Sequence, residues 1–324
     1  MRLKRLLVLA VLILPSFFTH AQSPTKLVFY TNWFAEAEHG GFYQAQAEGL
    51  YRQAGLEVEI RMGGPQVNGL QLLGAGRMDV FMGYDFQTLS ALEQGLPIVT
   101  IGATFQKDPA VIISHPGVKG LEALKGKPIY ISPASNTTFW PWLAARYGYS
   151  DAQKRPYAFS VQPFLADKTA SQQGYVTSEP HSIEKAGVKP VVFLLADRGY
   201  PPYAETLVTT RSVLKTKRES LQRFLQASAE GWKRYLADPA PGNALIRKDN
   251  PQMEPDLIAY GVARIREHAL VTGGDAGKLG LLTMTDERWK QTADFMGSAG
   301  MLKAGTDYRQ AYTLDLIRNV KVLP

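Results

Sequence analysis

The chain has 324 residues, of which 45% are hydrophobic and 20% are charged, and it contains no cysteine. This composition excludes a disordered or collagen-like chain, and the lack of cysteine excludes disulfides, thiolate metal sites and cysteine nucleophiles. The formal net charge is +7, but the Lys and Arg residues are scattered along the chain, so no nucleic-acid-binding face is predicted.

The first 21 residues have the pattern of a removable signal peptide. Three basic residues within the first five precede an apolar run over residues 6–18, and the small residue Ala21 follows shortly afterwards. The apolar run is too short to span a bilayer. We therefore expect cleavage near Ala21 and an exported mature protein.

From residue 26 to residue 101, apolar strand patterns alternate with helical patterns. Strands are predicted over residues 26–31, 56–60, 78–82 and 97–101, and helices over residues 41–54, 67–73 and 86–94. This alternation indicates a parallel sheet with helices on its faces.

The same alternation begins again near residue 110 and gives way to helices after Arg211. Strands are predicted over residues 110–114, 127–132, 157–161, 191–195 and 206–210, with a helix over 138–147. Four later helices are predicted over residues 213–238, 242–248, 255–268 and 286–300. The sequence before Gly174-Tyr175 also repeats the pattern before Gly83-Tyr84, which indicates a short strand there.

The order of these elements predicts an α/β protein with two lobes and a helical C-terminal region. The first lobe would start with residues 22–106, the second would comprise residues 107–204, and residues 205–324 would return to the first lobe and add the C-terminal helices. Ligands of open α/β sheets bind at the carboxyl ends of the strands. Two such sheets facing each other form a cleft with a hinge.

Catalytic motifs are absent from the sequence. The five histidines have no metal-binding spacing, and there is no nucleophile elbow, phosphate-binding loop or dinucleotide-binding motif. We therefore predict no catalytic residue, no metal and no cofactor. The expected activity is ligand capture.

Candidate ligand-binding residues follow the predicted strands of the first lobe: Asn32, Trp33, His39, Tyr84 and Asp85. Trp33 offers a flat stacking surface, and Tyr84 offers a ring with a polar tip. His39 can donate or accept a hydrogen bond near a helix start. The alternatives are that the aromatic residues fill the core, that His39 only packs or caps, and that Asp85 caps the helix beginning at residue 86.

Further candidates come from the second lobe and the second crossing between lobes: Asn136, Thr137, Tyr175, Glu179, Tyr203 and Glu205. Asn136 and Thr137 precede a predicted helix, where they could cap it or contact a ligand. A carboxylate in an aromatic cleft accepts hydrogen bonds from an amino-substituted heterocycle and repels sulfonate, nitrate or phosphate. The alternative for each glutamate is a solvated loop residue.

At these residues the chain resembles the substrate-binding proteins of ABC importers that carry thiamine pyrimidine precursors, a group related to the yeast-type pyrimidine synthase. The matching segments are Asn32-Trp33 with His39-Gly40, residues 49–58, residues 76–80, Gly83-Tyr84, Tyr175 with Glu179-Pro180, and Gly199-Tyr200-Pro201 with Tyr203 and Glu205. They span about residues 25 to 210. The run over residues 49–58 is shared with sulfonate and nitrate binders.

The resemblance implies a type II periplasmic binding protein fold, a periplasmic location, a small heteroaromatic ligand and an ABC permease in the inner membrane as partner, with the protein itself a monomer. It implies that Trp33 and Tyr84 stack on a pyrimidine, that Glu205 accepts its amino hydrogens and that His39 bonds a substituent. The synthase relatives use a cysteine-rich motif and a lysine for pyridoxal phosphate. This chain has no cysteine, and residues 32–42 contain no lysine, so a carrier is expected and not an enzyme.

Other ligands stay open at the level of sequence. Riboflavin, which close relatives carry, suits the same cleft chemistry. An alkanesulfonate or nitrate could instead use the helix start over residues 135–138. The family more often has an acidic residue where this chain has Asn32, and residues 167–173 are unusually polar. A solute sensor that docks a receptor is a further alternative to a transport protein.

Overall fold

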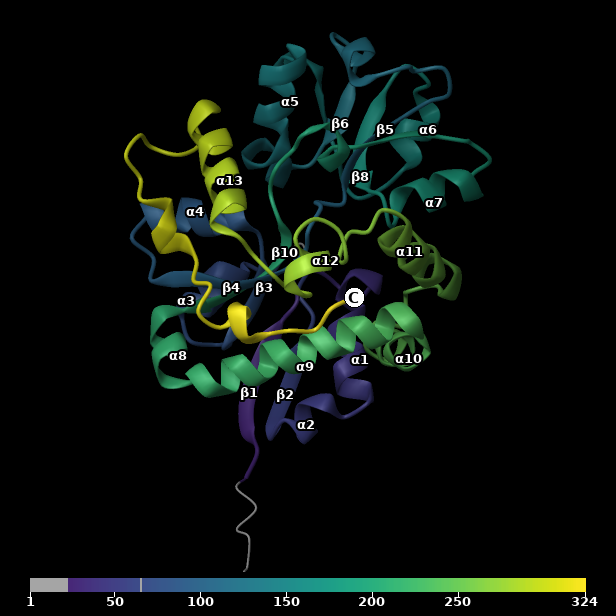
Figure 1. Cartoon of the computed structure of the whole chain (residues 1–324). Coiled ribbons are helices and arrows are strands. Elements are labelled where there is room, and N and C mark those ends of the chain that lie inside the picture. The colour runs from purple at the N-terminus through teal and green to yellow at the C-terminus, as the bar shows by residue number, and fades with distance from the viewer. Residues whose placement is uncertain (1–22, 65) are drawn as a thin grey trace, which may run out of the picture.

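The computed structural model describes residues 23–64 and 66–324, and it contains two five-stranded sheets. The two sheets lie one above the other in Figure 1, with the C-terminal helices wrapped around the lower one. The predicted signal peptide falls outside the described residues. Within the described ranges, no helix combines the length and the apolar character needed to cross a membrane.

The first sheet has a parallel part at one side, with β1 between β2 and β3, and an antiparallel strand β10 between β3 and β4. Its strands, in spatial order, are β2 (Leu56–Arg61), β1 (Thr25–Tyr30), β3 (Val80–Gly83), β10 (Ala204–Thr210) and β4 (Ile98–Phe105). Its helices are η1 (Ala37–His39), α1 (Gly40–Ala47), α2 (Leu50–Gln53), α3 (Gly69–Gly74) and α4 (Asp85–Glu93).

The second sheet pairs β6 in parallel with β7 and β8, and pairs β5 antiparallel with β8 and β9. Its strands, in spatial order, are β7 (Lys154–Pro156), β6 (Ile129–Ile131), β8 (Ser171–Tyr175), β5 (Ala110–Ser114) and β9 (Val191–Leu194). Its helical segments are η2 (Leu121–Leu124), η3 (Pro133–Thr137), α5 (Phe139–Tyr147), η4 (Asp151–Gln153), α6 (Gln162–Ala166), α7 (Glu179–Lys185) and η5 (Ala196–Arg198).

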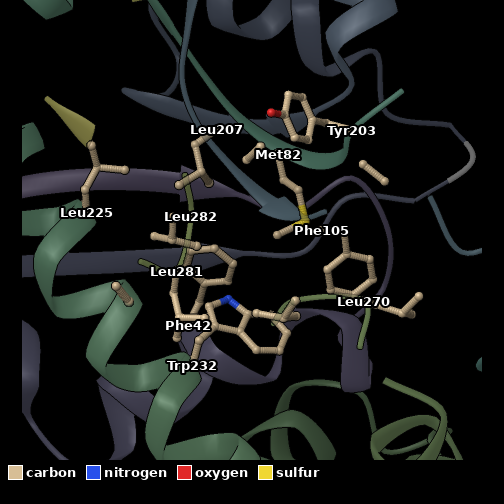
Figure 2. Packing of buried hydrophobic residues seen from close by; sticks show 14 of the residues in the cluster. Phe42, Met82, Phe105, Tyr203, Leu207, Leu225, Trp232, Leu270, Leu281 and Leu282 are labelled. Carbon is tan, nitrogen blue, oxygen red and sulfur yellow. The ribbon is translucent and has the colours of Figure 1, made fainter. Parts of the chain in front are cut away.

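The C-terminal region returns to the first sheet, and its long helix α9 runs across that sheet (Figure 1). Its elements are α8 (Arg211–Thr216), α9 (Arg218–Ala237), α10 (Ala240–Asp249), α11 (Pro255–Glu267), α12 (Ala276–Leu279), α13 (Asp286–Ser298), η6 (Tyr308–Ala311) and η7 (Ile317–Asn319). Figure 2 shows Trp232 of α9 packed near Phe42, Leu281 and Leu282.

Two glycines allow α1 to approach α9 closely. A Cβ atom at Gly40 would lie 2.0 Å from the ring of Tyr235, and one at Gly41 would lie 2.2 Å from the ring of Trp232. Because no real side chain tolerates such a distance, glycine is required for this helix pair. Its packing fixes where α1 starts, and therefore where His39 lies.

The chain passes twice between the sheets, after β4 and before β10, and α13 holds both crossings. The Arg288 guanidinium donates to the carbonyl of Gln106 at 3.0 Å and to the carbonyl of Pro201. The buried Asp85 carboxylate accepts hydrogen bonds from the backbone N–H of Tyr203 at 2.9 Å and from Thr292 at 3.0 Å. The two crossings are thus tied to one helix of the first lobe.

Several predicted elements differ from the structure. The helix predicted over residues 41–54 is two helices, because Gly49 between them is left-handed with φ of 71°. The helix over residues 213–238 is also divided, at Lys217. The strand predicted over residues 157–161 is wrong: strand pairing ends at Pro156, and Phe159 has φ of 57°. Helix α7 was not predicted, and it buries little apolar surface beyond Ile183.

Candidate functional site

The two lobes touch across the edge where the strands of the first sheet end. Trp33 of the first lobe contacts Phe159 of the second, with ring centroids 5.0 Å apart. The hydroxyls of Tyr84 and Tyr175 hydrogen-bond to each other between the lobes. We call the group of residues around these two contacts the inter-lobe site.

Three first-lobe candidates reach this site because their strands end at one edge of the sheet. Trp33 follows β1 and Tyr84 follows β3, and these two strands are parallel neighbours. Strand β10 runs the other way, with Thr206 paired to Gly83. Glu205 directly precedes Thr206 in β10, and its carboxylate reaches Asn32, the residue next to Trp33. This is the edge at which open α/β sheets bind ligands.

Glu205 is fully buried, and only one of its two carboxylate oxygens has a hydrogen-bond partner in the described part of the chain. Its Oε1 accepts a hydrogen bond from Asn32 Nδ2 at 3.1 Å, whereas Oε2 has no partner among the described residues. Its backbone is left-handed, with φ of 52°, which is costly for a residue with a side chain. Burial, with smaller contributions from Glu38 and Asp108, raises the pKa of this carboxyl well above its usual value.

Asn32 also fixes the hydrogen-bonding state of His39. Its Nδ2 donates to Glu205, so its Oδ1 acts as the acceptor for His39 Nε2 at 3.1 Å. The proton of the neutral imidazole is therefore on Nε2, and Nδ1 is an acceptor. This Nδ1 is buried and has no partner within the described ranges. Burial lowers the pKa of His39 to about 3, which keeps the ring neutral at physiological pH.

Acidic side chains from both lobes surround the site. Glu38 is buried and accepts a hydrogen bond from Thr177 of the second lobe, while Glu36 is partly buried. The pKa of Glu36 is raised by burial and by the neighbouring carboxylates of Glu38, Glu205 and Glu179. No ion pair involving these four carboxylates occurs in the part of the chain that the structure describes. The surroundings therefore favour hydrogen-bond donors and disfavour anions.

Glu179 is held by the second lobe. One carboxylate oxygen accepts from Tyr157 at 2.8 Å, and the other accepts from Ser178 at 2.6 Å and from the backbone N–H of Tyr175 at 2.8 Å. These bonds connect Glu179 to the tyrosine that faces Tyr84. The structure thus brings together seven of the predicted residues: Asn32, Trp33, His39, Tyr84, Tyr175, Glu179 and Glu205.

The other four predicted residues lie elsewhere. The backbone N–H of Tyr203 donates a hydrogen bond to the Asp85 carboxylate inside the first lobe. Figure 2 draws Tyr203 among the buried hydrophobic residues. The Tyr203 hydroxyl accepts from Thr285, so both residues hold the crossing. Asn136 and Thr137 are exposed on η3, where each donates a side-chain hydrogen bond back to a carbonyl of its own turn.

Sequence reasoning missed four residues of this region: Glu36, Glu38, Tyr157 and Phe159. The two glutamates lie on either side of Ala37, in the segment between Trp33 and His39. The sequence feature that could have indicated them is the position of acidic residues directly before a helix. Tyr157 and Phe159 alternate as in a strand, which led to the wrong strand prediction. In the structure their rings are 5.4 Å apart, and Phe159 reaches the first lobe.

Residues 23–64 and 66–324 include no group of three or more His, Asp or Glu side chains arranged to hold a metal ion. Among the buried carboxylates of Glu38 and Glu205, the Oε2 atom of Glu205 has no hydrogen-bond partner in the described part of the chain. No described side chain in this group offers a buried cation to an anionic ligand.

Comparison with known proteins gives both a family and a fold. A family model described as "NMT1/THI5 like" matches residues 36–241. The riboflavin-binding protein RibY of Chloroflexus aurantiacus is 25% identical over 290 residues, which is 85% of this chain and 81% of RibY. A 4-amino-5-hydroxymethyl-2-methylpyrimidine phosphate synthase of Aspergillus parasiticus is 28% identical over 110 residues, only 33% of this chain and 32% of that enzyme.

Solved structures with low sequence identity have the same fold. The periplasmic aliphatic sulphonate binding protein SsuA of Escherichia coli has a TM-score of 0.68 at 16% identity, covering 89% of this chain and 92% of SsuA. The Candida albicans CA3427 gene product, described as having the generic periplasmic binding protein fold, has a TM-score of 0.63 at 16% identity, covering 93% and 97%. The predicted two-lobe α/β fold is therefore confirmed.

Proposed function

The chain belongs to the NMT1/THI5-like family, and from this premise we propose that it is the substrate-binding component of an ABC importer. In this proposal it captures a small heteroaromatic nutrient between its lobes in the periplasm and delivers it to a membrane permease. The periplasmic fold of SsuA and of other ligand-binding components supports this role. The predicted signal peptide would supply the export.

The main support for this proposal is that one carboxylate oxygen of the buried Glu205 has no hydrogen-bond partner among the described residues. A buried acceptor without a partner is costly, and a ligand N–H removes that cost when it binds. Trp33 and Tyr84 at the same edge supply aromatic surfaces for a flat ring. A heterocycle with an amino group or ring N–H matches both features.

The first candidate ligand is a thiamine pyrimidine precursor, an aminopyrimidine whose amino group would donate to Glu205 Oε2. His39 Nδ1 is a second acceptor for a hydroxyl or amine substituent. Sulfonate and nitrate are disfavoured, because their charge would meet the carboxylates of Glu38 and Glu205 without a cation nearby.

Riboflavin is the second candidate, and one comparison favours it. RibY matches most of this chain, whereas the synthase match covers only about a third. The flavin ring system also carries one ring N–H that can donate to a carboxylate. The partial coverage of the synthases and the lack of cysteine support a carrier and not an enzyme.

A thermal-shift panel tests the proposed function. The mature protein, from residue 22 onward, is heated with 4-amino-5-hydroxymethyl-2-methylpyrimidine, riboflavin, thiamine, taurine or nitrate. A ligand at about 100 times its Kd adds about 2.7 kcal/mol to the free energy of unfolding, which is an easily measured rise in Tm. We expect a rise with a heterocycle alone. A rise with taurine or nitrate alone would overturn the proposal.

A further inference from the structure

Helix α11 connects the two lobes at a place outside the inter-lobe site. It packs against η1 of the first lobe, where a Cβ atom at its Gly261 would lie 2.8 Å from the Cβ of Ala37. The same atom would lie 3.4 Å from the carbonyl oxygen of Thr177, which belongs to the second lobe. Because glycine leaves no side chain in between, α11 contacts both lobes there. In Figure 1, α11 lies directly below α7 of the second lobe.

One carboxylate joins the facing sides of α7 and α11. Asp256 Oδ2 accepts hydrogen bonds from Lys185 Nζ at 2.7 Å and from His181 Nε2 at 3.3 Å. Since an ionised carboxylate can only accept, Nε2 of His181 carries a proton in this contact. The His181 ring also lies against that of Tyr260, with centroids 5.0 Å apart. Two side chains of the second lobe thus meet two of α11.

The contact is ionic and exposed to water. The hydrogen bond from Lys185, with a smaller contribution from His181, lowers the pKa of Asp256 to about 2, so this carboxyl is ionised at any pH above 5. The side chains of Lys185 and Asp256 are 58% and 49% exposed. Both charges therefore stay hydrated if the helices separate, and the pair can break without leaving a buried charge.

We propose that His181 and Lys185 of α7 and Asp256 of α11 form a reversible latch that holds the lobes together, and that protonation of His181 tightens it. Asp256 is a positioning residue in this account: it lies outside the inter-lobe site and acts by keeping η1 and Thr177 in contact. The inference goes beyond the proposed function, because it concerns the lobes themselves and holds for any ligand.

The pH dependence of the latch follows from histidine chemistry. Histidine changes its charge between pH 5 and pH 8, and a cationic imidazole binds an ionised carboxylate more strongly than a neutral one does. Asp256 faces His181 only while the helices are together, so the closed arrangement binds the proton more tightly than the open one. The contribution of His181 is therefore present at pH 5 and is lost as the pH rises towards 8.

Other charged groups lie near the latch and are the same in the variants compared below. They are Glu184 on α7 and Glu254, Arg264 and Glu267 around α11. Arg264 pairs with Glu267 at 2.6 Å and lies over the Tyr260 ring, 5.0 Å from its centroid. The acidic groups of the inter-lobe site are also unchanged, so their titration cancels when two variants are compared at one pH.

A single thiol can report separation of the lobes, because the chain has no cysteine of its own. Thr177→Cys places this thiol at a buried side chain of the second lobe that contacts Glu38 of the first. Its rate of reaction with dithiobisnitrobenzoate is divided by the rate of the same chain unfolded in urea at the same pH. The ratio gives the fraction of time for which the thiol is exposed. All variants are made in this background, and no ligand is added.

Charge reversal and charge exchange test the ion pair at pH 8. We expect Asp256→Lys to raise the exposed fraction about threefold or more, because an attraction is replaced by repulsion from Lys185. Adding Lys185→Glu exchanges the two charges and should return the exposed fraction to within about twofold of the background value. Asp315→Lys is the matched control, because Asp315 is 59% exposed and pairs with Arg218 away from the second lobe. It should leave the exposed fraction unchanged.

His181→Gln tests the proton. We expect it to raise the exposed fraction about two- to fivefold at pH 5 and to leave it unchanged at pH 8. An equal effect at both pH values, or no recovery on charge exchange, would overturn the latch. It would also be overturned if the background thiol reacts as fast as in the unfolded chain, or only as often as the whole protein unfolds in urea titrations. Because no ligand is present, each of these results would leave the proposed function standing.

Discussion

Glu205 combines three features that are unfavourable for folding: full burial, a left-handed backbone and an oxygen without a hydrogen bond. Each costs on the order of 1 to 3 kcal/mol. Such costs persist where the surrounding structure enforces them, and they are concentrated at binding sites. The hydrogen bond from Asn32 and the ladder between β10 and β3 hold the residue in this state.

The sequence indicated Glu205, Trp33 and Tyr84 because each follows or precedes a strand at one edge of the sheet. It did not indicate the hydrogen bonds by which Asn32 joins His39 to Glu205, because Glu205 is 173 residues from Asn32 and meets it only after folding. It also placed Asp85 and Tyr203 with the ligand. Their mutual hydrogen bond depends on how the crossing packs against α4.

Asp108, in the first crossing, gives a pH-dependent prediction. Burial raises the pKa of its carboxyl to about 7 from the ordinary value of 3.8, so the folded state keeps a proton that the unfolded state has released. Its contribution to stability is therefore present below pH 4 and is lost as the pH rises towards 7. We expect Asp108→Asn to gain stability relative to wild type between pH 4 and pH 8, by up to about 4 kcal/mol.

Urea unfolding at five pH values across this range measures the difference in the free energy of unfolding. Glu57→Gln is the control, because residue 57 is exposed and its charge stays in water in both states. A difference between Asp108→Asn and wild type that is constant from pH 4 to pH 8 would contradict the prediction.

At the scale of elements, apolar periodicity located most strands and helices but not their breaks. The break between α1 and α2 depends on the left-handed Gly49, and the end of β7 depends on the left-handed Phe159. Left-handed glycine is common, whereas a left-handed phenylalanine carries no local signal. Strand β8 has the polar residues Gln172 and Gln173 and was visible only through its likeness to the segment before Tyr84.

Helix α13 leads to a prediction about the crossings. Arg288 bonds carbonyl groups of both crossings, and its guanidinium lies over the Tyr203 ring at 5.0 Å from the centroid. Arg288→Met keeps the apolar stem but removes every donor. We expect a loss of stability of about 2 kcal/mol and faster trypsin cleavage after Lys107, which lies in the first crossing.

Arg309→Met is the matched control, because Arg309 is exposed and the change removes the same charge. Urea unfolding and mass-spectrometric mapping of the first tryptic cuts provide the two measurements. If the bond after Lys107 is as resistant in Arg288→Met as in wild type, α13 does not hold the crossings.

At the scale of the whole molecule, the two-lobe fold was predictable because strand and helix patterns alternate twice before the helical tail. The contacts that bring the two lobes together could not be predicted from the sequence. Trp33 contacts Phe159, and Thr177 donates a hydrogen bond to Glu38. Both contacts form because the two crossings set how the second lobe is oriented relative to the first. Such contacts depend on tertiary arrangement and leave no periodic pattern in the sequence.

The carboxylates that the two lobes bring together also determine which ligands favour contact between the lobes. The first lobe contributes Glu36, Glu38 and Glu205 to the inter-lobe site, and the second lobe contributes Glu179. Bringing these carboxylates together in a low-dielectric space is unfavourable unless protons or donor groups accompany them. A ligand rich in N–H and O–H groups satisfies this requirement and favours the closed arrangement.

The central claim is that Glu205 accepts a hydrogen bond from a heterocycle held between the lobes. The most direct test is the Kd of the heterocycle that binds wild-type protein, measured by calorimetry for wild type, Glu205→Gln and the exposed control Glu57→Gln. Glu205→Gln replaces an acceptor oxygen with an amide NH2 group that cannot accept, and leaving a buried ligand N–H without its partner costs about 1 to 3 kcal/mol. We therefore expect Glu205→Gln to bind about tenfold more weakly or worse, while Glu57→Gln binds as wild type does. An unchanged Kd in Glu205→Gln would contradict the account.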